Sequence, residues 1–199
     1  MAAQAVRRLG RLTTRNCYFL LCDMQEKFRP SIRYFPEIIT VAQRMVRAAN
    51  ILKIPVIATE QYPKGLGNTV SEIDVSSARV FSKTIFSMAI PEVMEIMSAE
   101  PMRNSVVIFG IETQVCVQQT ALDLLDKGYD VHILADGCSS RSQVDRMLAL
   151  ERLRAAGAFL TTSESVVFEL LGDSKHPNFK EVQALVKTSA PDSGLLTKL

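Results

Sequence analysis

Residues 105–110, SVVIFG, and the segment that follows them, IETQVCV at residues 111–117, decide the fold of this chain. The first segment is almost continuously apolar and ends on a glycine, which is typical of a strand buried on both faces of a parallel sheet. The apolar spacing then changes to that of a helix, with Val117, Ala121 and Leu124 on one stripe. A strand that leads directly into a helix is the unit of a doubly wound α/β fold.

The same unit recurs along the chain. Apolar runs predict further strands at residues 17–23, 55–60, 130–136 and 158–162, with a weaker strand at 79–81. Helical spacing predicts further helices at residues 38–52, 142–153, 164–171 and 179–187, and the second of these ranges opens with a capping pattern at Ser142. Right-handed crossovers between such units give an α/β sheet that is covered by helices on both faces.

Composition limits the partners of this chain. Its 199 residues fit one domain, and 47% hydrophobic composition excludes disorder. A formal net charge of +2 gives little electrostatic reason to bind nucleic acid or an anionic membrane, so we expect neither partner. Four cysteines without a CxxC pair suit free thiols in a reducing compartment.

The two ends of the chain differ from its centre. Residues 1–16 contain four arginines and no acidic residue, and we expect a flexible tail there. The same composition resembles a short mitochondrial presequence, so the expected location is the cytoplasm, with the mitochondrion as the alternative. The domain is expected at residues 17–190 and an irregular tail at 191–199.

Reactive side chains follow several of the predicted strands. In an open α/β sheet ligands bind beyond the carboxyl ends of the strands, where Asp23 and Lys83 fall. Cys116 lies early in the helix after residues 105–110, and with Thr113 as the cap its sulfur would feel the positive end of the helix dipole. Lys83 stands among apolar residues and needs a carboxylate partner, for which Asp23 is the natural candidate.

Each of these residues also has a purely structural interpretation. Taken alone, Cys116 is more often a packing cysteine, Asp23 a loop cap and Lys83 a surface lysine. His132 and His176 are too few and too scattered for a histidine metal centre or a Ser-His-Asp triad, and no GxGxxG fingerprint follows the first strand. We therefore expect neither a metal nor a cofactor.

Three segments together resemble the signature of a known family. LCDMQEKF around Asp23, SKT around Lys83 and GIETQVCV around Cys116 are similar to the three motifs of the isochorismatase-like cysteine hydrolases. The resemblance extends from about residue 17 to residue 187, and segments such as TEQYPKGLG and DGCSSRSQVDR are closer still to a eukaryotic subfamily. It implies a three-layer αβα fold with a six-stranded, mostly parallel, Rossmann-like sheet.

The resemblance also implies catalytic roles. Cys116 would be the nucleophile, Asp23 its general base and Lys83 the cation that stabilises the thiolate. A cis peptide bond would join Ile111 to Glu112, and the backbone N–H groups of Glu112 and Cys116 would hold the oxyanion. We expect a substrate pocket lined by Phe28, Gln61, Tyr62 and Glu112.

Family members that carry the cysteine hydrolyse C–N bonds, whereas the enzymes that act on isochorismate commonly lack it. The expected substrate is therefore a small amide or ureido metabolite, which forms an acyl-enzyme on Cys116. Nicotinamidases carry an Asp/His metal cluster where this chain has Glu60-Gln61-Tyr62, which argues against a metal. The alternative is a catalytically silent member that binds a protein or a ligand. Family members are commonly dimers or tetramers, so we expect a homo-oligomer.

Overall fold

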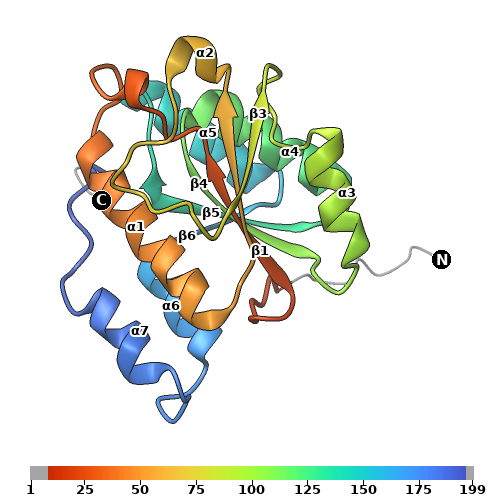
Figure 1. Ribbon diagram of the computed structural model, residues 1–199, viewed down its shortest axis with the longest axis vertical. Coiled ribbons are helices and arrows are strands. Elements are labelled where there is room, and N and C mark those ends of the chain that lie inside the picture. The colour runs from red at the N-terminus through yellow and green to blue at the C-terminus, as the bar shows by residue number, and fades with distance from the viewer. Residues whose placement is uncertain (1–8, 196–199) are drawn as a thin grey trace.

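Six parallel strands form the central sheet of the computed structural model, which describes residues 9–195 (Figure 1). The strand order is β3-β2-β1-β4-β5-β6, so the direction of winding reverses between β1 and β4. The strands are β1 (Cys17–Cys22), β2 (Val56–Gln61), β3 (Arg79–Lys83), β4 (Ser105–Gly110), β5 (Asp130–Cys138) and β6 (Phe159–Thr161). The predicted α/β fold is confirmed, and every pair of neighbouring strands is parallel.

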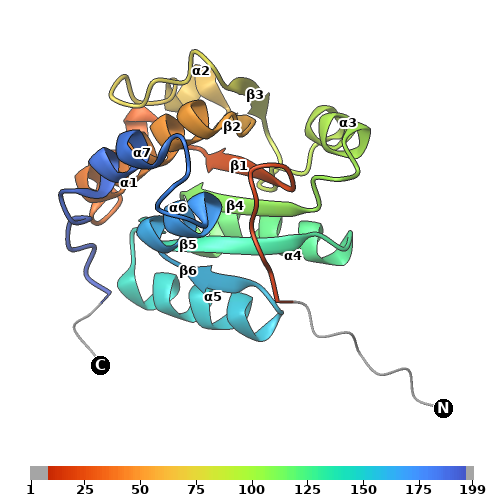
Figure 2. The same ribbon diagram turned by 90° about the horizontal axis from the view of Figure 1, so that it is seen from below.

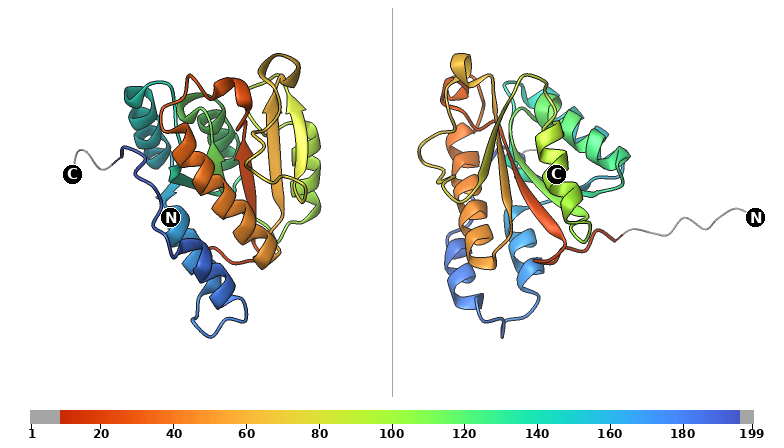
Figure 3. Two further views of the ribbon diagram at one scale, coloured as in Figure 1. Left: turned by 60° about the vertical axis from the view of Figure 1, so that its left-hand side comes forward. Right: turned by 45° about the vertical axis from the view of Figure 1, so that its right-hand side comes forward.

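Helices cover both faces of this sheet. The first face carries α1 (Phe35–Leu52), α6 (Ser163–Leu171) and α7 (Phe179–Val186), and the second carries α3 (Pro91–Ala99), α4 (Gln118–Asp126) and α5 (Gln143–Ala155). Figures 2 and 3 show the sheet between these two layers. Side chains alternate along β1, so Phe19 and Leu21 pack toward α1 while Tyr18 and Leu20 pack toward α3 and α4.

The five predicted helices are all found, as α1, α4, α5, α6 and α7. The Ser142 side chain accepts a hydrogen bond from the Asp145 N–H at 3.2 Å, so Ser142 caps α5 as its sequence pattern predicts. Helix α3 was not predicted, because only Val93 and Met97 of its nine residues are buried. Three shorter helical turns complete the described chain: η1 (Glu26–Phe28), α2 (Pro63–Leu66) and η2 (Thr113–Val117).

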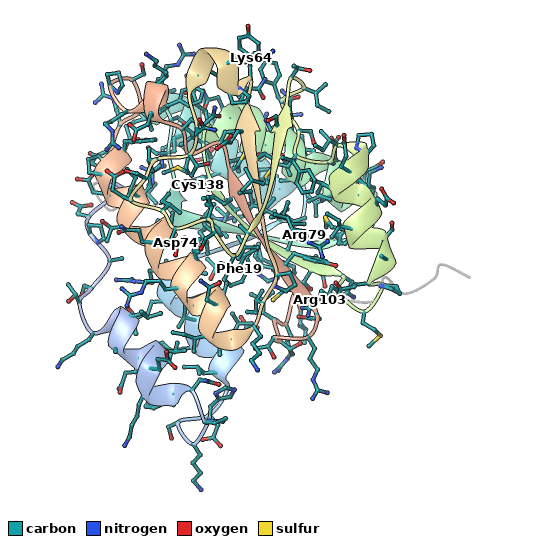
Figure 4. All side chains as sticks on the ribbon, viewed as in Figure 1. Phe19, Lys64, Asp74, Arg79, Arg103 and Cys138 are labelled. Atoms are coloured by element: carbon teal, nitrogen blue, oxygen red, sulfur yellow. The ribbon has the colours of Figure 1, made fainter. Side chains whose placement is uncertain are left out.

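The carboxyl ends of the strands lie at the end of the molecule that carries α2. Figure 4 labels Lys64 of α2 at the top of the view and Arg103 well below it, near the start of β1. The Arg103 guanidinium donates to the Thr14 and Cys17 carbonyl oxygens at 3.0 Å, which fixes the amino end of β1. Functional side chains at the carboxyl edge are therefore expected at the α2 end.

Segments near both chain ends contact the domain. Leu12 is buried, and its N–H donates to the Glu169 carboxylate at 2.9 Å, so contacts begin before the predicted boundary at residue 17. Ser193 accepts a hydrogen bond from Arg146 at 2.6 Å, within a stretch that forms neither helix nor strand. Residues 1–8, with Arg7 and Arg8, and residues 196–199 lie outside the described residues. Within residues 9–195, no helix combines the length and the apolarity that crossing a bilayer requires.

Candidate active site

The end of β1 places Asp23 over the ends of its neighbours. The Asp23 N–H donates to the Thr59 carbonyl oxygen at 3.1 Å, and the backbone there adopts a left-handed conformation with φ of 49°. The carboxylate accepts the Thr59 hydroxyl at 2.7 Å and the Lys83 ammonium at 2.7 Å. Because β1, β2 and β3 are adjacent and parallel, their carboxyl ends bring these three side chains together.

Lys83 is an almost fully buried cation. Its side chain is 0% exposed and that of Asp23 1%, and the structure pairs Lys83 with the partner that the sequence predicted. The ammonium also donates to Gln61 Oε1 at 2.7 Å and to the Phe86 carbonyl oxygen at 2.8 Å. A buried ion pair is tolerated only when its remaining hydrogen-bonding capacity is satisfied, as it is here.

Cys116 reaches the same cluster from the other half of the sheet. It lies on η2, a π-helical turn between β4 and α4, in which the Val117 N–H donates to the Glu112 carbonyl oxygen at 3.2 Å. Such turns often occur at functional sites. The Cys116 thiol lies near enough to the Asp23 carboxylate and to the Cys22 thiol to shift the pKa of both groups. Thiol, carboxylate and ammonium therefore form one interacting cluster.

The predicted capping role of Thr113 is wrong. Thr113 is the first residue of η2, and its hydroxyl donates to the Ser139 carbonyl oxygen at 3.0 Å instead of capping a helix. The preceding peptide bond, Ile111–Glu112, is cis, as the family resemblance implies. The π-helical turn was not predictable, because it adds one residue to a pattern that otherwise fits an α-helix.

Burial and charge act in opposite directions on the two ionised groups. Burial raises the pKa of Asp23 above its ordinary value, although Lys83 and the hydrogen bonds from Cys116 and Thr59 oppose that rise. Burial lowers the pKa of Lys83, but the acidic groups around it more than compensate, so the pKa is raised. Burial also holds the pKa of Cys22 well above its ordinary value. Lys83 therefore remains an ammonium, and Asp23 is a stronger base than an exposed aspartate.

A cavity of 400 Å³ opens above Cys116. Its lining residues come from loops that follow several strands: Lys27, Phe28, Ser31, Gln61, Leu66, Phe86, Glu112, Val115, Cys116 and Arg141. Of the predicted pocket residues, Phe28, Gln61 and Glu112 line this cavity. Tyr62 does not: it is 55% exposed and lines a neighbouring hollow beside Pro63 and Ile90.

The carboxylate of Glu112 is held at the edge of the cavity. It accepts the Arg141 N–H at 3.0 Å, lies 3.3 Å from Arg141 Nε and accepts the Gln114 amide at 3.1 Å. The positive charge of Arg141 therefore offsets the negative charge that Glu112 brings to the pocket. Sequence reasoning missed Arg141, although its position in the loop after β5 is at the carboxyl edge of the sheet.

The remaining titratable candidates have structural roles. His132 stacks on Phe159 with ring centroids 4.9 Å apart, and burial lowers its pKa. Asp136 accepts the N–H and the hydroxyl of Ser163, the first residue of α6, so it holds the start of that helix. Within residues 9–195, no three His, Cys, Asp or Glu side chains gather as metal ligands.

A doubly wound sheet that brings a thiol, a carboxylate and an ammonium together beneath a small cavity defines a class of cysteine hydrolase. The model of the isochorismatase domain family matches residues 17–165. The chain therefore belongs to the isochorismatase-like cysteine hydrolase family, and its membership supports hydrolysis as the general activity.

Relatives of this chain confirm its resemblance to one eukaryotic subfamily. Isochorismatase domain-containing protein 2 of Xenopus laevis is 60% identical over 193 residues, which cover 97% of this chain and 94% of that protein. The protein of the same name from Homo sapiens is 53% identical over 188 residues, with 94% and 91% coverage. The solved structure of the MAR1 ribonuclease from Caenorhabditis elegans has a TM-score of 0.90 and 49% identity, with 95% and 100% coverage.

Proposed function

We propose that this protein is a metal-independent cysteine hydrolase that cleaves the C–N bond of a small amide or ureido metabolite. The observation that supports the proposal is the cluster of Cys116 with the Asp23–Lys83 ion pair beneath the 400 Å³ cavity. These groups supply a nucleophile, a base and a stabilising charge. A cavity of this size accommodates a metabolite rather than a folded partner.

The reaction would proceed in two stages. Asp23 removes the thiol proton as the Cys116 sulfur attacks the carbonyl carbon, and the N–H groups of Glu112 and Cys116 hold the oxyanion. The C–N bond breaks, the amine leaves with the proton from Asp23, and a thioester remains on Cys116. Water then attacks this thioester with Asp23 as base, which releases the acid and restores the thiol. Lys83 stabilises the negative charge on the thiolate and on Asp23 throughout.

Metabolite turnover tests this proposal. Wild type and Cys116→Ser are incubated with an unbiased metabolite extract and with a panel of amides and ureides, and products are identified by mass spectrometry. Wild type is expected to release an amine or ammonia, and Cys116→Ser to release none. A second measurement traps the acyl-enzyme with an electrophilic amide analogue, which is expected to modify Cys116 alone. Product formation that survives Cys116→Ser would refute the proposed nucleophile.

A ribonuclease is a second candidate, because the C. elegans structure of 49% identity bears that name. Lys27 and Arg141 at the cavity could contact phosphate. Among the described residues that line the cavity, however, none is a histidine able to act as acid and base near neutral pH. Single-stranded RNA therefore belongs in the substrate panel, and we expect no cleavage that depends on Cys116. The same panel also tests the alternative that the protein is a catalytically silent family member that binds a protein or a ligand. In that case no substrate would give a Cys116-dependent product.

We further propose that the protein is a homo-oligomer, a dimer or tetramer, that works on a small molecule in the cytoplasm or the mitochondrion. Light scattering after size-exclusion chromatography tests the first part, since the chain has a mass of 22.1 kDa. A single peak at the monomer mass would refute it. Localisation of the tagged full chain, with and without substitution of its N-terminal arginines, tests the second part.

A further inference from the structure

The ammonium of Lys83 has no donor left for a substrate. A protonated lysine carries three N–H donors and no acceptor. Those donors go to Asp23 Oδ2 at 2.7 Å, Gln61 Oε1 at 2.7 Å and the Phe86 carbonyl oxygen at 2.8 Å. Lys83 therefore acts on the reaction only through its charge and its position, and both depend on these partners.

Gln61 is the neutral side chain among these three partners, and its amide has one possible orientation. Its oxygen must face Lys83, because an ammonium only donates. Its Nε2 then donates to the Thr84 carbonyl oxygen at 2.7 Å. The backbone is held as firmly: the Gln61 N–H donates to Gln25 Oε1 at 2.7 Å, and the Gln61 carbonyl oxygen accepts Gln25 Nε2 at 2.9 Å. Gln25 is itself fully buried.

The Gln61 amide must be neutral because the positive charge of Lys83 is already balanced by the negative charge of Asp23. Lys83 and Asp23 form one buried cation–anion pair, and Cys116 becomes a second anion only when it reacts. A carboxylate at position 61 would compete with Asp23 for the same ammonium and would place a further negative charge beside the thiol. An apolar side chain of similar length would remove this acceptor and leave only the longer contact to the Ile85 carbonyl oxygen, at 3.3 Å, for that N–H.

We propose that Gln61 is a positioning residue: its side-chain oxygen holds the Lys83 ammonium against Asp23 without adding charge, and it thereby maintains the arrangement in which Cys116 reacts. This inference rests on the roles given to Cys116, Asp23 and Lys83 in the proposed function. It differs from the expectation that Gln61 contacts substrate, because positioning acts on the enzyme before any substrate binds.

Alkylation of Cys116 by iodoacetamide tests the proposal without a natural substrate. The rate is measured from pH 5 to pH 9 by peptide mass spectrometry on the full chain, for wild type, Gln61→Glu, Gln61→Met and the control Gln43→Met. Gln43 suits this purpose because it lies on the exposed side of α1, where its amide donates to the Glu72 carbonyl oxygen. Circular dichroism and urea midpoints establish that each variant is folded.

The two substitutions are expected to act differently. Gln61→Glu keeps an acceptor for Lys83 but adds charge, so its rate profile is expected to shift upward by about one pH unit, which slows alkylation about tenfold below the midpoint. At high pH its rate is expected to return to that of wild type. Gln61→Met is expected to slow alkylation about tenfold across the range, and Gln43→Met to match wild type.

Profiles of Gln61→Glu and Gln61→Met that coincide with wild type would overturn the proposal. An unchanged profile combined with a raised KM for an identified substrate would also overturn it, because that result assigns Gln61 to substrate contact. Failure of the proposed function is distinguishable from both outcomes. In that case the metabolite panel yields no Cys116-dependent product, while the alkylation profile of Gln61→Glu still shifts and the positioning role stands.

Discussion

Among single residues, the three proposed catalytic groups depend on neighbouring side chains that hold them in place. Asp23, Lys83 and Cys116 follow predicted strands, and the structure gathers them into one cluster. The hydrogen bonds from Thr59 to Asp23 and from Lys83 to Gln61 depend on side-chain direction. Neither periodicity nor composition carries that information.

The pH dependence of turnover reports on Asp23. The base works only when it is ionised, and its pKa is raised above the ordinary value of 3.8, so activity should be lost as the pH falls through this raised pKa. The acidic limb of kcat/KM is therefore expected at a higher pH than that of an exposed aspartate. Asp23→Asn is expected to lower kcat at least about 100-fold and to remove this limb. An inflection near pH 3.8 in wild type would contradict the assignment.

Removal of Lys83 should destabilise the protein. Lys83→Met leaves the Asp23 carboxylate buried without its cation, which typically costs about 3–5 kcal/mol in the free energy of unfolding. Urea denaturation followed by circular dichroism measures this cost. Arg29→Met is the matched control, because Arg29 pairs with Glu26 and Glu72 at the surface and its loss should leave the midpoint nearly unchanged. Equal midpoints for both variants would argue against a structural role for the buried pair.

Among the secondary-structure elements, strands were predicted most accurately where helices bury both of their faces. The run at residues 105–110 matches β4 residue for residue, because a strand covered on both faces is continuously apolar. Strand β5 runs two residues beyond its predicted end, to Cys138, after an irregular register between β4 and β5. Helix α3 and the turn η2 escaped prediction: only two of the nine residues of α3 are buried, and η2 adds one residue to a pattern that otherwise fits an α-helix.

The junction of β4 and η2 makes a strong prediction for Gly110. A Cβ atom there would lie 2.1 Å from the Cys22 carbonyl oxygen, and its φ is +126°. Gly110→Ala should therefore lower the free energy of unfolding by about 4 kcal/mol or prevent folding. Gly128→Ala is the control: a Cβ there meets nothing within 4 Å, so only its left-handed φ of +87° opposes the change, at about 1 kcal/mol. Similar urea midpoints for both variants would show that the close approach is unimportant.

At the scale of the whole molecule, the two helical layers were predictable and the cavity was not. Two-sided burial of the strands already requires helices on both faces of the sheet. The cavity gathers side chains from segments as distant as Lys27 and Arg141, and their meeting depends on the paths of loops. Tyr62 illustrates the difficulty: it adjoins Gln61 in sequence yet lines a different hollow.

Cysteine accessibility provides a test at this scale. All four cysteines are buried, but Cys116 is 7% exposed and lines the cavity. Burial raises the pKa of Cys17 and of Cys138 to about 12, and that of Cys22 well above its ordinary value, so these three remain thiols at neutral pH. A small thiol reagent is expected to label one site in the native protein and four in urea. Native labelling of Cys116→Ser at one site would contradict this expectation.

The saturated ammonium of Lys83 has a consequence for inhibitor design. A carboxylate or sulfonate aimed at this cation gains no hydrogen bond, since it would have to displace Asp23, Gln61 or the Phe86 carbonyl oxygen. An acidic group on a designed compound should instead point outward, toward Lys27 or Arg141 at the rim. Inside the pocket, affinity should come from an electrophilic group that reacts with the Cys116 sulfur and from aromatic rings that pack against Phe28 and Leu66.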